Sequence, residues 1–377
     1  MRKFFRTFFV LLLLLVAGFA AYALITGKTY LFKAVYYNFA GIDDYKIFTN
    51  DTVHVAGPQP WLVDAGSTVT MPDSLASLLA GLNTVAVLVI RDGKIVFEKY
   101  DDGYSDSSLS NSFSMAKSIT SLLVGAAIRE GLIRSVNDRV GNYLPEFSTG
   151  LAAGLKIRDL LTMSSGSNWD ESYANPLSVT TEAYYGSDLR STATSVSIKK
   201  TPGTYFSYKS GDTELLGLIV EKATGRSLAN YAAEKLWRPI GAEHPALWST
   251  DRAGGSAKAY CCFNTNARDF ARIGQLMLDS GKWKGTPIID SNYFSESVSP
   301  CLVPDESGQP TTYYGYQWWI RPAYPGVFYA RGILGQYIIM IPSRKMVMVR
   351  LGHKRSSRRV NDAPEEVDAL INWGMGL

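Results

Sequence analysis

Residues 84–100 read TVAVLVIRDGKIVFEKY, and this stretch decides the fold. Two runs rich in β-branched and aromatic residues, 84–90 and 94–100, flank the tripeptide Arg91-Asp92-Gly93. An Asp-Gly pair between two such runs is a strong signal for a β-hairpin. The sequence therefore predicts two antiparallel strands here, and the rest of the chain is interpreted outward from them.

The elements beyond this hairpin follow a simple order. Apolar residues recur at three- and four-residue spacings in 114–128, which predicts a helix, and helical patterns continue to about residue 290. Strand-rich segments at 313–320 and 326–351, and an amphipathic helix at about 364–373, close the chain. Strands at both ends with helices between them predict an α+β fold, an antiparallel sheet flanked by helices with a helical insertion.

The N-terminus has the pattern of an export signal or a membrane anchor. Arg2, Lys3 and Arg6 precede an uncharged apolar run, 8–25, which is near the lower limit for spanning a bilayer. Apolar residues continue past Ala21-Tyr22-Ala23, a candidate cleavage site, so an uncleaved anchor is favoured.

This pattern divides the chain into three parts. We expect residues 1–27 to anchor the protein in the inner membrane, residues 28–73 to form an extended lead-in arm, and residues 74–377 to form one periplasmic domain. Cleavage of the N-terminal segment would instead give a secreted protein.

The composition of the chain bears on nucleic-acid binding, on disulfide formation and on metal binding. The net charge is +4 without a long basic run, so nucleic-acid binding is not expected. The three cysteines, Cys261, Cys262 and Cys301, cannot all pair within one chain. A bridge from one of the adjacent pair to Cys301 and three free thiols both remain open. The three histidines are far apart in sequence, so neither a metal site nor a cofactor is expected.

Ser114 and Lys117 are the first candidates for chemistry. Residues at i and i+3 share a face of a helix, so the hydroxyl and the amine are expected within reach of each other. Serine is a poor nucleophile unless a base takes its proton, and a desolvated lysine can be neutral enough to do so.

Two more candidates lie later in the chain. Tyr208 follows the Pro202-Gly203 turn and is expected at the tip of a loop. A neighbouring lysine would make the tyrosine more acidic and able to shuttle protons. The alternative is that Tyr208 only packs against its neighbours. Gly332 lies within a predicted strand and marks a close backbone approach. A free N–H there would bind a developing oxyanion.

The chain resembles the serine β-lactamase and penicillin-binding-protein family, which has three motifs in a fixed order. The matching segments here are Ser-x-x-Lys, then Tyr-x-Ser, then a strand that contains glycine. Three further segments are similar to recurring family segments: LLTMSSG at 160–166, TPG at 201–203 and LWRPIG at 236–241. The resemblance covers roughly residues 75–375 and implies a β-lactamase/transpeptidase-like fold. Residues 314–319 and Gly335-Gln336 look closest to class C-like esterases and 6-aminohexanoate-dimer hydrolases.

The resemblance also implies roles for individual residues. Ser114 would be the acylated nucleophile, Lys117 its base and Tyr208 the general acid/base. The backbone N–H groups of Ser114 and Ile333, beside Gly332, would form the oxyanion hole. Tyr173 falls where the dimer hydrolases place a tyrosine that contacts substrate.

The chain departs from the family pattern in two places. The third motif reads Ala330-Arg331-Gly332, without the Lys or His that β-lactamases have at the first position, and a one-residue shift points Arg331 to the opposite face of a strand. Ser210 replaces the asparagine common in β-lactamases. These departures favour a small ester or linear amide as substrate over a β-lactam or a D-alanyl-D-alanine peptide.

Other classes are less consistent with the sequence. A Ser-His-Asp hydrolase of the α/β type needs a Gly-x-Ser-x-Gly pentapeptide, which the chain lacks. The adjacent acids Asp170 and Glu171 are expected to diverge, which argues against a glycosidase. A non-catalytic protein that binds cell-envelope peptides remains an alternative, although it would not need Ser114, Lys117 and Tyr208 together.

Overall fold

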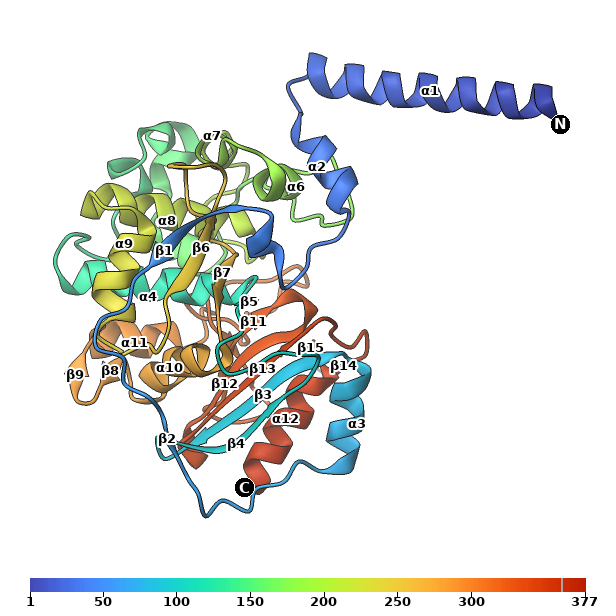
Figure 1. Cartoon of the computed structure of the whole chain (residues 1–377). Helices are drawn as coiled ribbons and strands as arrows, with labels where there is room; N and C mark the ends of the chain where they lie inside the picture. Colours follow the sequence, from blue (N-terminus) through green and yellow to red (C-terminus); the bar gives the residue numbers. More distant parts are fainter. Residues whose placement is uncertain (361) are drawn as a thin grey trace.

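The computed structural model describes residues 1–360 and 362–377, and its centre is a seven-stranded sheet (Figure 1). The strand order is β10-β11-β12-β13-β3-β4-β2, and every neighbouring pair is antiparallel except β2 with β4. The strands are β2 (Leu62–Val63), β3 (Thr84–Arg91), β4 (Lys94–Tyr100), β10 (Trp319–Ile320), β11 (Phe328–Gly332), β12 (Gln336–Ile341) and β13 (Met346–Gly352). Both ends of the chain build this sheet, which confirms the α+β prediction.

The hairpin at 84–100 is confirmed. Strands β3 and β4 pair with Arg91 opposite Lys94, and the two residues between them, Asp92 and Gly93, have φ of 49° and 75°. Positive φ at both central positions gives the turn whose twist matches that of the strands. In the C-terminal half, the predicted strand at 313–320 is shorter than expected: only Trp319–Ile320 is a strand, because Gln317, with φ of 65°, interrupts the extended backbone.

The two faces of the sheet are covered by different helices. Along β3, Leu88 and Ile90 belong to the main core, which includes α10 (Ala267–Leu278), whereas Val87 and Val89 point to the opposite face. That face is covered by α3 (Asp73–Gly81) and α12 (Glu365–Gly376). This alternation follows from the two-residue period of a strand.

The helical insertion surrounds α4 (Met115–Arg129), which is buried over almost its whole length. Its polar residues are hydrogen-bonded: the hydroxyls of Ser118 and Thr120 donate to the carbonyls of Gln317 and Ala259. The other helices are α5 (Ile157–Leu161), α6 (Val179–Tyr185), α7 (Leu189–Thr194), α8 (Ser210–Thr224), α9 (Leu228–Ala232) and α11 (Ser291–Ser297). Short strands complete it: β5 (Ser110–Asn111), β6 (Ala246–Thr250), β7 (Phe263–Thr265), β8 (Lys282–Trp283) and β9 (Thr286–Pro287), with the pair β14 (Arg359–Val360) and β15 (Ala363–Pro364) near the C-terminus.

The segment 28–73 was expected to be an extended arm, and its first part differs from this expectation. It begins with the helix α2 (Tyr30–Tyr37), which buries Tyr30 and Leu31. Strand β1 (Thr49–Val53) then pairs with β6, so the segment supplies the edge of a second sheet of order β1-β6-β7-β5. The segment is therefore part of the folded body of the protein.

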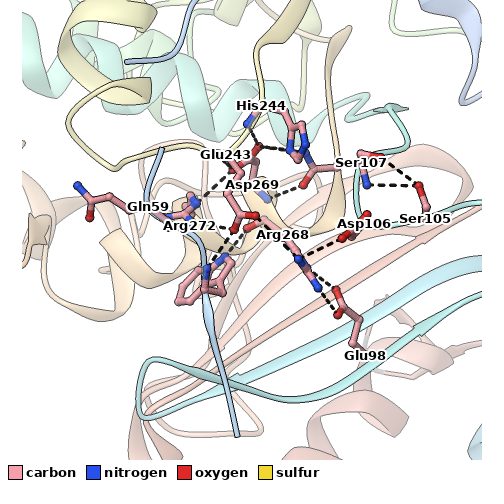
Figure 2. A network of polar contacts seen from close by, with 12 residues as sticks. Gln59, Glu98, Ser105, Asp106, Ser107, Glu243, His244, Arg268, Asp269 and Arg272 are labelled. Carbon is pink, nitrogen blue, oxygen red and sulfur yellow. Dashed lines mark hydrogen bonds and ion pairs between the residues drawn. The ribbon is translucent and has the colours of Figure 1, made fainter. Parts of the chain in front are cut away.

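A partly buried polar network ties α10 to the main sheet and, through the bond that Arg272 donates to the carbonyl of Gln59, to this segment (Figure 2). Arg268 donates to both carboxylate oxygens of Glu98 at 2.8 and 2.7 Å, and Arg272 pairs with Glu243 at 2.9 Å. Asp269 accepts hydrogen bonds from Arg272 and from the backbone of Glu243. Asp269 is therefore a structural acid that pairs with an arginine.

Ahead of α2, α1 (Arg2–Ile25) projects away from the body of the protein (Figure 1). Its mean hydropathy reaches 2.8 over an 18-residue window, so it is long and apolar enough to cross a membrane. A signal sequence would have the same properties.

Candidate active site

Ser114 and Lys117 meet at the N-terminus of α4. Ser114 caps the helix, Lys117 lies in its first turn, and the Lys117 Nζ donates a hydrogen bond to Ser114 Oγ at 2.9 Å. The same amine donates to the carbonyl of Tyr260 at 2.9 Å and lies 5.2 and 5.5 Å from the ring centroids of Tyr208 and Tyr260. The i, i+3 spacing thus places the amine against the hydroxyl, as the sequence predicts.

The surroundings of Lys117 favour its neutral form. The side chain is 1% exposed, and burial lowers the pKa of Lys117 to about 8 because the ammonium loses its hydration. The negative charges of Glu171 and Glu214 act in the opposite direction and keep that pKa from falling further. A substantial fraction of Lys117 is then neutral near pH 8 and has a lone pair that can accept the Ser114 proton.

Tyr208 lies beside this pair but differs from the expectation in its acidity. Burial raises the pKa of Tyr208, and a hydrogen bond with Ser114 offsets only part of that effect. Lys209, the neighbouring lysine in sequence, donates its Nζ to the carbonyl of Ser167. The predicted acidic tyrosine is therefore wrong, and Tyr208 is a neutral phenol that can donate a proton.

Glu171 is the residue that sequence reasoning missed. Its carboxylate accepts from both the backbone N–H and the hydroxyl of Ser210 at 2.6 Å, and from the hydroxyl of Tyr173 at 2.5 Å. Ser210 is the first residue of α8, so a negative charge lies at the positive end of a helix. Glu171 thereby fixes Tyr173, whose side chain is 56% exposed, at the edge of the site.

Gly332 permits β11 to lie directly against the segment before Ser114. A Cβ atom at Gly332 would lie 2.2 Å from the carbonyl oxygen of Ser112 and 3.2 Å from the Cβ of Phe113. This contact brings Ile333 to the nucleophile. No acceptor for the backbone N–H of Ser114 or of Ile333 is found among residues 1–360 and 362–377, so both donors are available to a substrate oxygen.

A cavity of about 240 Å³ opens at Ser114. Of the predicted site residues, Ser114, Tyr173 and Ile333 line it, together with Ser210. Lys117 contacts Ser114 from behind this wall, and Tyr208 lines a second cavity that also contains Arg331. The wall also contains Asn38, Phe39 and Ala40 from the segment after α2, together with Tyr184 and Tyr185 from α6. The sequence offers no signal for this contribution from the N-terminal segment.

The cysteines form neither the expected bridge to Cys301 nor three free thiols. Cys261 and Cys262 form a disulfide between adjacent residues, and Cys301 is free. Cys261 lines the cavity and follows Tyr260, whose carbonyl accepts from Lys117. No cluster of three or more metal-ligating side chains is found in the part of the chain that the structure describes.

The third motif is arranged as the one-residue shift predicts. Ala330 is fully buried in the core on one face of β11, and Arg331 lies on the other. The guanidinium carbon of Arg331 is 3.6 Å from the ring centroid of Trp319, and that ring lies 5.6 Å from the ring of Tyr208. Arg331 therefore contacts the site through Trp319 and does not line the cavity at Ser114.

Comparisons with known proteins agree with this geometry. The family model described as Beta-lactamase matches residues 73–371. The 6-aminohexanoate-dimer hydrolase of Paenarthrobacter ureafaciens is 29% identical over 304 residues, covering 74% of this chain and 76% of that protein. Two solved structures share the fold. A candidate 6-aminohexanoate-dimer hydrolase from Bacillus anthracis has a TM-score of 0.70 at 23% identity and covers 89% of this chain and 91% of its own. A family VIII carboxylesterase has a TM-score of 0.64 at 19% identity, covering 81% and 95%.

Proposed function

The chain belongs to the beta-lactamase family, whose members of this type are serine hydrolases, and from that membership we propose that it cleaves an ester or a linear amide through an acyl-enzyme on Ser114. One observation carries the proposal: the buried amine of Lys117 lies 2.9 Å from the Ser114 hydroxyl and has a pKa lowered to about 8. A nucleophile in contact with a base of suitable pKa is the minimum that acyl transfer requires.

The first half of the reaction forms the acyl-enzyme. Neutral Lys117 takes the Ser114 proton while Oγ bonds to the substrate carbonyl carbon. The N–H groups of Ser114 and Ile333 bind the resulting oxyanion. As the carbonyl carbon loses its alcohol or amine, Tyr208 donates a proton to the leaving group and recovers one from Lys117.

The second half releases the acyl group. Water takes the place of the leaving group and attacks the acyl carbon, and its proton follows the reverse path through Tyr208 and Lys117 to Ser114 Oγ. Ser114 is regenerated and a carboxylic acid leaves. This cycle uses only side chains and backbone groups of this chain, together with the ester or amide and water.

The choice of ester or linear amide rests on two observations. Ala330 supplies no cation at the position where β-lactamases carry one, and Arg331 stacks on Trp319 outside the cavity. The similarity to a 6-aminohexanoate-dimer hydrolase, a name that denotes linear amide cleavage, points the same way. We further propose that α1 anchors the protein in the inner membrane with its domain in the periplasm, because its apolar run follows a basic N-terminus.

A fluorophosphonate probe tests the proposed nucleophile. We expect the full-length protein to be labelled covalently, and Ser114→Ala to abolish labelling. An unlabelled, folded wild-type protein would overturn the proposal and favour a peptide-binding protein. Rates with p-nitrophenyl acetate, a linear amide dimer and nitrocefin then test the substrate class. Nitrocefin turnover faster than ester turnover would overturn the argument from Ala330 and favour a β-lactamase or D-alanyl-D-alanine peptidase.

A further inference from the structure

The segment that follows the N-terminal helix forms part of the wall of the cavity at Ser114. Phe39 and Ala40 line it together with Ile333 and Leu334 of the β11–β12 connection. Asn38 has φ of 58°, so the chain leaves α2 through a left-handed residue and turns toward the cavity. The cavity wall beside the nucleophile is thus largely apolar. Part of this wall comes from residues that precede the domain 74–377.

This wall is held in place by specific contacts. The rings of Tyr37 and Tyr185 stack with centroids 6.3 Å apart. The hydroxyl of Tyr184 donates to Asp44 at 2.6 Å. The carbonyl of Ile42 accepts from the backbone N–H of Asn111 at 2.8 Å, three residues before Ser114. The segment is therefore a fixed part of the site.

The same segment is short and begins at the end of α1. Thirteen residues separate Ile25 from Phe39, and eight of them form α2. The rise of a helix and the reach of an extended chain place Phe39 within roughly 35 Å of the end of α1. When α1 spans a bilayer, the cavity wall therefore lies close to the membrane surface.

Several apolar side chains of this segment are exposed to solvent. Tyr36 and Phe39 are each 81% exposed, and Val35 is also exposed. Aromatic residues are enriched at the boundary between membrane and water. This exposed patch follows the proposed membrane-spanning helix directly in sequence. We therefore expect the patch to contact the membrane surface.

We propose that the substrate is an ester or amide of an apolar acyl chain, taken up from the membrane surface, and that Phe39 contacts the acyl chain in the cavity. This rests on the proposed function and adds the substrate class. The acyl carbon bonds to Ser114 Oγ, the alcohol or amine leaves with a proton, and water then releases the acyl chain as a carboxylic acid. Phe39 sets the preference for the acyl chain and takes no part in proton transfer.

The test uses the full chain in phosphatidylcholine vesicles with p-nitrophenyl dodecanoate and p-nitrophenyl acetate. We expect kcat/KM for the dodecanoate to exceed that for the acetate by more than 10-fold. Phe39→Ser should reduce this ratio at least fivefold. Leu62→Ser is the matched control, because Leu62 is an exposed apolar residue on β2 that does not line the cavity. It should leave the ratio unchanged.

A second arm tests delivery from the membrane. The dodecanoate is placed either in the vesicles that carry the protein or in a separate vesicle population. We expect hydrolysis at least 10-fold faster when protein and ester share a membrane. Equal rates in both arrangements, or equal efficiencies for both esters, would overturn this inference. Fluorophosphonate labelling of the same preparation separates the two proposals, since labelling without chain-length preference leaves the proposed function intact.

Discussion

Arg331 stacks on Trp319, with its guanidinium carbon 3.6 Å from the ring centroid. Trp319 also contacts the ring of Tyr208, at a centroid distance of 5.6 Å, so its ring connects the Arg331 cation to the Tyr208 phenol. Its charge also lowers the pKa of Tyr208 against the larger effect of burial. Arg331 is therefore a positioning residue for Tyr208.

Replacing Arg331 should impair turnover more than binding. Arg331→Leu removes a cation–π contact of about 0.5–2 kcal/mol, and we expect kcat to fall severalfold with little change in KM. Arg331→Lys should recover part of kcat because it restores the charge. Steady-state kinetics of both variants check this, and an effect confined to KM would contradict the positioning role.

The activity should rise with pH through the titration of Lys117. Its pKa is lowered to about 8, and only the neutral amine accepts the Ser114 proton, so kcat/KM is expected to increase up to and slightly above pH 8. Lys117→Met should reduce kcat by about 10²–10⁴-fold and abolish this limb of the profile. A flat wild-type profile between pH 6 and pH 9 would show that Lys117 is not the base.

Glu171→Gln should shift that profile toward lower pH. The charge of Glu171 raises the pKa of Lys117, so its removal lets that pKa fall and populates the neutral amine at a lower pH. Glutamine can still accept from Ser210, which limits structural damage. The control is Asp170→Asn, at an exposed neighbouring acid that does not contribute to the Lys117 pKa. A shift of the same size in the control would contradict the assignment.

Gly332→Ala should disrupt the contact between β11 and the segment before Ser114. The added Cβ would lie 2.2 Å from the Ser112 carbonyl, and overpacking of this kind costs about 1–3 kcal/mol. We expect a lower Tm and slower fluorophosphonate labelling. Gly154→Ala is the control, because its Cβ would meet no atom within 4 Å. Unchanged labelling in a folded Gly332→Ala protein would mean that this close approach is not needed.

The disulfide between Cys261 and Cys262 predicts a simple count of thiols. Denatured but unreduced protein should react with an alkylating reagent at Cys301 alone, and reduced protein at all three cysteines. We also expect reduction to slow ester hydrolysis of the native enzyme, because the adjacent carbonyl of Tyr260 orients Lys117. Mass spectrometry of the alkylated peptides gives the count directly.

The sequence predicts the parts of the site that depend on local geometry or on a recognised motif. Ser114 and Lys117 are three residues apart on a helix, so their contact follows from the helical repeat. The hairpin follows from one Asp-Gly pair. Tyr208 and Ile333 are separated from Ser114 by long stretches of chain, and only the family resemblance could place them beside it.

The features that sequence reasoning missed all depend on distant contacts. The partner of Glu171, Ser210, is 39 residues away and becomes visible only when α8 is placed. The contribution of Phe39 to the cavity requires the packing of α2 on α6. The acidity of Tyr208 was predicted with the wrong sign because burial, which a sequence does not display, has a larger effect than nearby charge.

The main sheet joins strands from both ends of the chain, and this has a consequence for how the protein is made. Strand β3 has β13 as one neighbour, more than 250 residues later, so it emerges from the ribosome long before the sheet can close. Pairings this distant in sequence form slowly, and unpaired apolar strands are prone to aggregate. If α1 holds the chain at the membrane during export, the unpaired strand β3 is kept apart from other copies of the protein until β13 has been made. Anchoring by α1 would then reduce aggregation before the sheet forms.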